Sequence, residues 1–251
     1  MQAFARNMSR VNLRFISWAS TLVAPILFSA LGVEAQPAQP IDQISLVHGI
    51  DASVQARIDH VAGYMVTEHY AVFRNGDETH PAAEMTVRTD YRKEQGKSYT
   101  ILSQSGSGLL RSQLLGAVLG REKQMSQPGM RETVLVTSAN YEMKLKSATT
   151  DMVDGHACLV LGLTPRRNSP SLFKGTLWVD AADYSIVQLE GTAAKSPSFL
   201  TGATQVMRQY AKFEGFPMAT HASAVSKSVL LGQTVVKIDY SGYQIQLRPG
   251  Q

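Results

Sequence analysis

The sequence predicts an α+β fold, in which one strongly curled antiparallel sheet carries helices on its concave face. Three observations lead to this prediction. Extended stretches follow one another along most of the chain and are separated by turn pairs such as Asn75-Gly76, Asp154-Gly155 and Glu214-Gly215, which are typical of β-hairpins. Only two long segments show the spacing of an amphipathic helix. Strands and helices do not alternate, so the rhythm of a parallel sheet is missing.

Length and composition agree with a single globular domain. The chain has 251 residues, of which 44% are hydrophobic and 18% are charged, and this balance excludes disordered and collagen-like proteins. The net charge is only +4 and there is no long basic run, so we expect no nucleic-acid partner. The single cysteine, Cys158, excludes an intramolecular disulfide, and its apolar surroundings favour a buried thiol over a nucleophile.

The amino-terminal segment has the pattern of a secretory signal peptide. Three arginines precede an apolar stretch of 17 residues from Phe15 to Leu31, and small residues then lead to a predicted cleavage after Ala35. An uncleaved anchor is the alternative, but a helix that spans a membrane usually needs about 20 apolar residues. We therefore expect a periplasmic protein. The predicted segments are a signal peptide (1–35), a linker (36–50) and a folded domain (51–251).

The first predicted helix begins at Asp51, because a short carboxylate there is suited to cap the helix. Its apolar positions Val54, Ile58, Val61 and Met65 recur at the spacing of one buried helix face. A second apolar stripe predicts a helix over about 107–120, and a shorter helix is expected at 130–137. The residues of the second stripe are Leu110, Leu114, Leu115, Val118 and Leu119.

Ten strands surround these helices in the sequence. They cover approximately 64–74, 84–93, 98–103, 141–150, 157–165, 173–179, 184–192, 203–213, 219–230 and 233–245. A single antiparallel sheet of this width twists and curls. If two narrow helix stripes fill its concave face incompletely, an apolar cavity remains.

Hairpins in the second half of the chain carry recognisable motifs. Asp154-Gly155 precedes an apolar run to Leu161, Thr164-Pro165-Arg166-Arg167 follows, and Trp178-Val179-Asp180 leads into the next hairpin at 183–188. These segments resemble the carboxy-terminal sheet of LolA-like bacterial outer-membrane lipoprotein-sorting proteins, and 194–199 is similar to a segment of an uncharacterised branch of that superfamily. The resemblance covers about 139–245. It implies an incomplete, unclosed β-barrel wrapped around helices, with an apolar cavity for acyl chains and no enzyme chemistry.

From this resemblance we expect a periplasmic binding or carrier protein for lipoproteins or other acyl-bearing lipids, involved in outer-membrane lipoprotein sorting. An envelope-stress sensor or protein-interaction module with an envelope protein partner, built on the same fold, is the alternative. The predicted lipid-binding residues are Val54, Ile58, Val61, Trp178 and Phe199.

Signatures of catalysis and of metal binding are missing from the sequence. The 6 histidines form no His-Glu-x-x-His motif, and His69 and His80, which a hairpin could bring together, lack a third ligand. Asp180 and Asp183 flank a turn, where carboxylates usually cap backbone amides. An exported hydrolase is therefore the least favoured interpretation, and we expect no enzyme activity, no metal and no cofactor.

Overall fold

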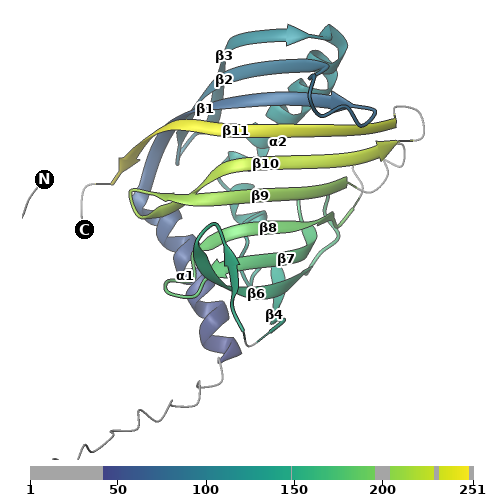
Figure 1. The fold of residues 1–251 in the computed structure, drawn as a ribbon. Helices are drawn as coiled ribbons and strands as arrows, with labels where there is room; N and C mark the ends of the chain where they lie inside the picture. Colours follow the sequence, from purple (N-terminus) through teal and green to yellow (C-terminus); the bar gives the residue numbers. More distant parts are fainter. Residues whose placement is uncertain (1–41, 148, 196–203, 229–231, 249–251) are drawn as a thin grey trace, which may run out of the picture. The chain divides into compact units, whose positions relative to one another are not determined.

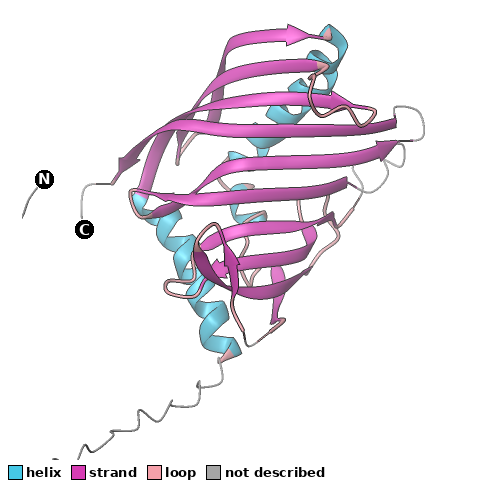
Figure 2. Cartoon of the chain, in the orientation of Figure 1, coloured by secondary structure: helices cyan, strands magenta, loops and turns pink. Residues whose placement is uncertain are grey.

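The computed structural model describes residues 42–147, 149–195, 204–228 and 232–248. These residues form an 11-stranded antiparallel sheet with helices packed on one of its sides (Figures 1 and 2). The predicted signal peptide and Phe199 lie outside the described residues. None of the described helices is long and apolar enough to cross a membrane.

The helices and strands have the following bounds. The helical segments are α1 (Gln43–His60), the π-helical turn η1 (Leu110–Leu115), α2 (Gly116–Ser126) and the 3-10 turn η2 (Arg131–Thr133). The first strands are β1 (Val61–Arg74), β2 (Ala83–Arg92), β3 (Gly96–Gly106), β4 (Tyr141–Leu145) and β5 (Asp151–Val153). The remaining strands are β6 (His156–Pro165), β7 (Phe173–Asp180), β8 (Ile186–Ala193), β9 (Thr204–Phe213), β10 (Phe216–Ser228) and β11 (Gly232–Leu247).

The strands are ordered β3-β2-β1-β11-β10-β9-β8-β7-β6-β4 across the sheet, and β5 also pairs with β6. Two distant parts of the chain therefore meet where β1 pairs with β11. The helical segment between β3 and β4 connects the two edges of the sheet (Figure 1). Among the described strands β3 and β4 do not pair, so the sheet stays open. The predicted fold class, an unclosed antiparallel sheet over helices, is confirmed.

Local turn chemistry explains why the hairpins were predictable. Asp154 and Gly155 have φ values of 47° and 81°, and Glu214 and Gly215 have values of 49° and 82°. Two successive residues with positive φ form the turn type that matches the twist of a hairpin, and glycine at the second position accommodates it without strain.

One predicted strand is divided in the structure. The strand expected over 141–150 ends at Leu145, and Asp151–Val153 pairs separately with the same neighbour, β6. Between them, the Ser147 hydroxyl lies 2.7 Å from the Thr149 hydroxyl and accepts a 3.1 Å hydrogen bond from the Thr149 amide. Such local bonds compete with the ladder of a sheet, so the chain leaves the sheet here and rejoins it.

Helix α1 begins earlier than predicted. Asp42, rather than Asp51, caps it, because its carboxylate accepts hydrogen bonds from the amides of Ile44 (3.2 Å) and Ser45 (3.0 Å). The predicted linker therefore ends before Gln43, and 43–50 are helical. The buried stripe is correspondingly longer, and Val61 is the first residue of β1 instead of a helical residue. The buried residues of α1 are Leu46, Ile50, Val54 and Ile58.

The second helix also differs from its prediction. It starts as a π-helical turn at Leu110 and continues as α2 to Ser126, past Gly120 where the prediction ended. The shorter helix expected at 130–137 is a single 3-10 turn, Arg131–Thr133. The predicted apolar stripe does face the sheet, and Leu115 is completely buried.

Both helices pack on the same side of the sheet, over different halves (Figure 2). In the first core, α1 lies against β4, β6, β7 and β8, with residues such as Ile50, Leu161 and Leu177. In the second core, η1 and α2 lie against β1, β2, β10 and β11, with residues such as Leu115 and Val87.

Candidate functional site

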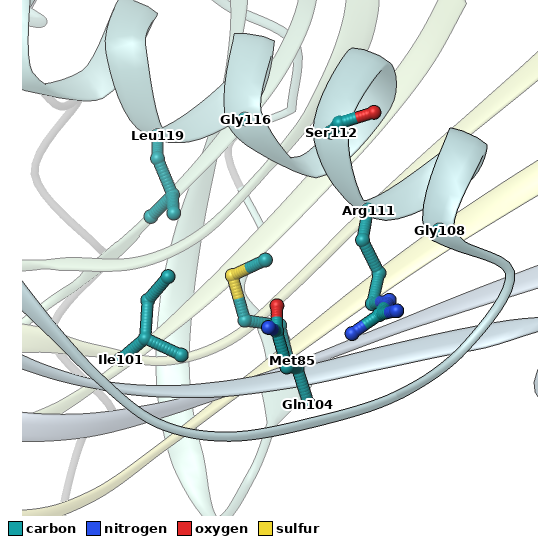
Figure 3. Close-up of a pocket in the computed structure, with 8 residues that line it drawn as sticks. All are labelled: Met85, Ile101, Gln104, Gly108, Arg111, Ser112, Gly116 and Leu119. Carbon is teal, nitrogen blue, oxygen red and sulfur yellow. The ribbon is translucent and has the colours of Figure 1, made fainter.

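An open groove lies between the η1–α2 segment and the outer strands β2 and β3 (Figure 3). Its volume is about 360 Å³, which is within the range of small-molecule sites. The groove is lined by Met85 of β2, by Ile101 and Gln104 of β3, and by Gly108, Arg111, Ser112, Gly116 and Leu119 of the helical segment and the residues before it.

The helical wall comes from one face of the η1–α2 segment. Gly108, Ser112, Gly116 and Leu119 follow one another at intervals of four or three positions, the spacing that places residues above one another on a helix. Arg111 lies beside Ser112 on the same wall. Gly108 and Gly116 contribute no side chain to this wall, which leaves space between the helix and the sheet. Leu115 points into the second core and is 0% exposed, so it fixes the helix beneath the groove.

The strand wall depends on a β-bulge in β3. Thr86 of β2 pairs with Ser103, whereas the next residue, Val87, pairs with Ile101, so Leu102 is the extra residue. Strict alternation would place residues an even number of positions apart on one face. Because of the bulge, Ile101 and Gln104 both line the groove. Ile101 remains 52% exposed, an unusual position for a large apolar side chain next to an open groove.

The groove changes from apolar to polar along its length. Leu119 and Ile101 lie at one end, and Arg111 lies on the other side of Met85 and Gln104 (Figure 3). Most of the lining is apolar. The guanidinium of Arg111 and the amide of Gln104 are therefore the groups that could orient a bound molecule.

A cluster of charged side chains lies on the same side of the sheet. Glu68 of β1 is 0% exposed and accepts a hydrogen bond from the Tyr70 hydroxyl. The Lys97 Nζ atom is 3.4 Å from Glu68 Oε1 and 2.5 Å from Glu122 Oε2. Arg208 of β9 reaches the other oxygen of Glu122 at 3.3 Å. Each carboxylate in this cluster thus has a cationic partner.

The pKa values in this cluster are shifted by mutual attraction. Burial alone would raise the pKa of Glu122, but the Lys97 ammonium and the Arg208 guanidinium outweigh it and lower the pKa. Burial would likewise lower the pKa of Lys97, whereas Glu122, Tyr64 and Glu68 raise it well above its usual value. Helix α2 has no fully buried residue; Val118 and Leu119 pack against the second core, and Glu122 adds ion pairs with Lys97 and Arg208. The helical wall of the groove is thereby held at Leu115 and at Glu122.

The predicted lipid-binding residues are not brought together in the structure. Val54, Ile58 and Val61 are buried, and none of them lines the groove. Trp178 alternates with two residues of the first core, Leu177 and Val179, so its half-buried side chain lies on the opposite face of the sheet. Phe199 is outside the described residues. The groove is instead formed at the edge of the second core.

The residues considered for catalysis serve other roles. Cys158 is fully buried, and burial raises the pKa of its thiol. The carboxylates of Asp180 and Asp183 accept hydrogen bonds from the amides of Ala182 (2.9 Å) and Ser185 (3.1 Å), as predicted for turn residues. Both carboxylates also pair with Lys212, at 3.3 and 2.7 Å.

The histidines do not form a metal centre in the described part of the chain. His69 Nε2 is 3.4 Å from Glu84 Oε1, and His80 Nδ1 is 3.2 Å from Asp77 Oδ2, so each ring has its own partner. Across the described ranges, no three metal-ligating side chains are close enough to hold an ion.

Comparisons with known proteins give matches among solved structures. No protein-family model matches the chain and no curated protein is significantly similar to it. A LolA superfamily protein from Nitrosomonas europaea is 15% identical, with a TM-score of 0.43 over 82% of this chain and 94% of that chain. A putative outer membrane lipoprotein-sorting protein domain from Vibrio parahaemolyticus is 14% identical, with a TM-score of 0.45 over 78% and 91%.

A third match is a DUF1329 family protein from Desulfovibrio piger ATCC 29098. It is 12% identical to this chain, with a TM-score of 0.40, and the match covers 80% of this chain and 93% of that chain. The likeness in all three cases is one of fold, and function rests on this chain's own residues.

Proposed function

We propose that this protein binds the acyl chain of a lipid or of a lipid-modified protein in the groove between η1–α2 and β2–β3. One observation carries the proposal: a groove of about 360 Å³ is open to solvent while its wall exposes apolar surface at Ile101. Each methylene group that leaves water contributes about 0.8 kcal/mol. A chain of several carbons would therefore bind even after the cost of ordering it.

The proposed role is that of a non-enzymatic carrier or holder in the cell envelope, within outer-membrane lipoprotein sorting. The resemblance of the second-half hairpins to LolA-like proteins supports this role, and the export pattern before Ala35 supports a periplasmic location. In this role the protein shields an acyl chain from water without changing it chemically.

A titration with a fluorescent fatty acid tests the proposal. The purified protein is compared with Ile101→Gln and Leu119→Gln, and with Ile44→Gln as a matched control, because Ile44 is 79% exposed on α1 and outside the groove. We expect saturable binding by the wild type and the control. Each groove variant should bind about tenfold more weakly, since it loses part of the apolar contact with the chain.

Two outcomes would contradict the proposal. Equal affinity in all four proteins would place the ligand outside the groove, and absence of saturable binding by the wild type would reject acyl binding. Competition by a lipopeptide but not by the same peptide without its acyl chain would support a carrier. Equal competition by both peptides would instead favour the alternative, a protein-interaction module.

A further inference from the structure

Arg111 lies in a mostly apolar groove and has no side-chain partner among the described residues. It makes no ion pair and no side-chain hydrogen bond with any described residue, and its Nε atom is buried without a hydrogen-bond partner. A buried donor that is left unsatisfied is unfavourable, and native structures usually satisfy such groups. Because Arg111 lines the groove, its positively charged guanidinium can meet a molecule that enters there.

The surroundings of Arg111 lack opposing charge. Residues 95–121, which form β3 and most of the helical wall, contain Lys97, Arg111 and Arg121 but no aspartate or glutamate. Glu122 of α2 pairs with Lys97 and Arg208. Glu84 of β2 lies on the face opposite to its neighbour Met85, where it accepts a hydrogen bond from Ser105. Among the residues that line the groove, an anion would thus meet one charged side chain, the cationic Arg111.

The apolar end of the groove lies at a defined distance from this charge. Arg111 and Leu119 are eight residues apart on the same helical face, which corresponds to about two helical turns. On the strand side, Gln104 and Ile101 are arranged in the same sense, with the amide nearer to the guanidinium (Figure 3). A molecule that is charged at one end and apolar along its length fits this arrangement.

We propose that the groove selects single-chain amphiphiles with an anionic head, which is a carboxylate or a phosphate. The head is bound by Arg111 with the Gln104 amide beside it, and the chain lies toward Leu119 and Ile101. This inference rests on the proposed function, because it requires an acyl chain in the groove. Charge-assisted hydrogen bonds from a guanidinium are stronger than neutral ones, so the head should determine which of several chains of equal length is bound.

Calorimetric titrations with three probes of equal chain length test the inference. The probes are dodecanoate, dodecyl phosphate and the neutral dodecan-1-ol, at pH 8 and below their aggregation concentrations. The proteins are the wild type, Arg111→Gln, Arg111→Lys and the matched control Arg121→Gln, which removes an exposed arginine outside the groove. Circular dichroism spectra and unfolding midpoints of all four proteins verify that they are folded.

The wild type and Arg121→Gln should bind at least one anion about tenfold more tightly than the alcohol, which is the usual effect of a hydrogen bond to a charged group. Arg111→Gln should lose this preference while its affinity for the alcohol stays within about twofold, and Arg111→Lys should retain part of the preference. Preference for one anion over the other would identify the head as a carboxylate or a phosphate.

The inference and the proposed function fail in different ways. If the wild type binds all three probes with equal affinity, or if Arg111→Gln weakens the anions and the alcohol equally, the head-group inference is overturned and acyl binding stands. If the wild type binds none of the probes, acyl binding in the groove is overturned and the inference falls with it.

Discussion

Glu122 shows at the scale of a single residue how a charge helps to attach a helix that has no fully buried residue. Its carboxylate is held by Lys97 and Arg208, and these cations lower its pKa from 4.5 although burial alone would raise it. A carboxyl group whose pKa is lower in the folded state stabilises the protein above its unfolded pKa. That stabilisation is lost as the pH falls through the folded pKa. The cluster should therefore stabilise the fold at neutral pH and fail in acid.

Replacing Glu122 by glutamine tests this mechanism. We expect the free energy of unfolding at pH 7 to fall by about 3 kcal/mol, because the buried Lys97 loses its closest partner. The variant should also lose less stability than the wild type when the pH is lowered below about 4.5, since the group that titrates there is gone. Urea unfolding at several pH values measures both effects.

Glu94→Gln is the control for this experiment, because Glu94 is 78% exposed in its pair with Arg248. Its loss should change the free energy of unfolding by less than about 1 kcal/mol. Similar behaviour of the two variants would show that the Glu122 pairs contribute no more than surface ion pairs.

Cys158 should be unreactive in the folded protein. Its side chain is fully buried, and burial raises the pKa of the thiol, so little reactive thiolate is present at pH 8. A water-soluble aromatic disulfide reagent should release its chromophore only in the presence of denaturant. Fast reaction without denaturant would show that this part of β6 is accessible.

At the scale of elements, two glycines in helices should respond oppositely to alanine. A Cβ atom on Gly49 of α1 would clash with the Tyr184 ring, whereas one on Gly120 of α2 would meet nothing within 4 Å. Gly49→Ala should lower the free energy of unfolding by about 1 kcal/mol, because overpacking exceeds the helix preference of alanine. Gly120→Ala should raise it by up to about 1 kcal/mol. Thermal unfolding of both variants measures these changes in stability. An equal gain in stability in both variants would mean that Tyr184 does not pack on α1.

The elements also show how much could be predicted from the sequence. The hairpins were predictable because pairs such as Asp154-Gly155 encode their turn locally. The start of α1 differs from its prediction because the prolines before it indicate a linker, whereas Leu46 and Ile50 extend the helical stripe. The groove was missed because it depends on the bulge at Leu102 and on the packing of η1 against β2. Both are set by tertiary contacts that no local pattern reveals.

At the scale of the whole molecule, the fold depends on one long-range pairing. Strand β1 pairs with β11 over most of its length, so the strands that form the groove are joined to the rest of the sheet only when the end of the chain is in place. The family resemblance covered the second half of the chain, whereas the groove lies in the first half. Resemblance could therefore predict the architecture and not the site.

Export is also a property of the whole chain. We expect cleavage after Ala35, so the protein recovered from a periplasmic fraction should begin at Gln36 when its amino terminus is sequenced. An uncleaved chain in the inner-membrane fraction would contradict this prediction and support an anchored protein instead.

The most direct test of acyl binding in the groove is photo-cross-linking with a dodecanoate that carries a diazirine at the end of its chain. After irradiation, mass spectrometry identifies the labelled residues. The structure predicts labels on β3 and α2 around Ile101 and Leu119, at the apolar end of the groove, and an excess of unlabelled dodecanoate should suppress them. Labels concentrated around Val54 of α1, or labels that excess dodecanoate does not suppress, would contradict acyl binding in this groove.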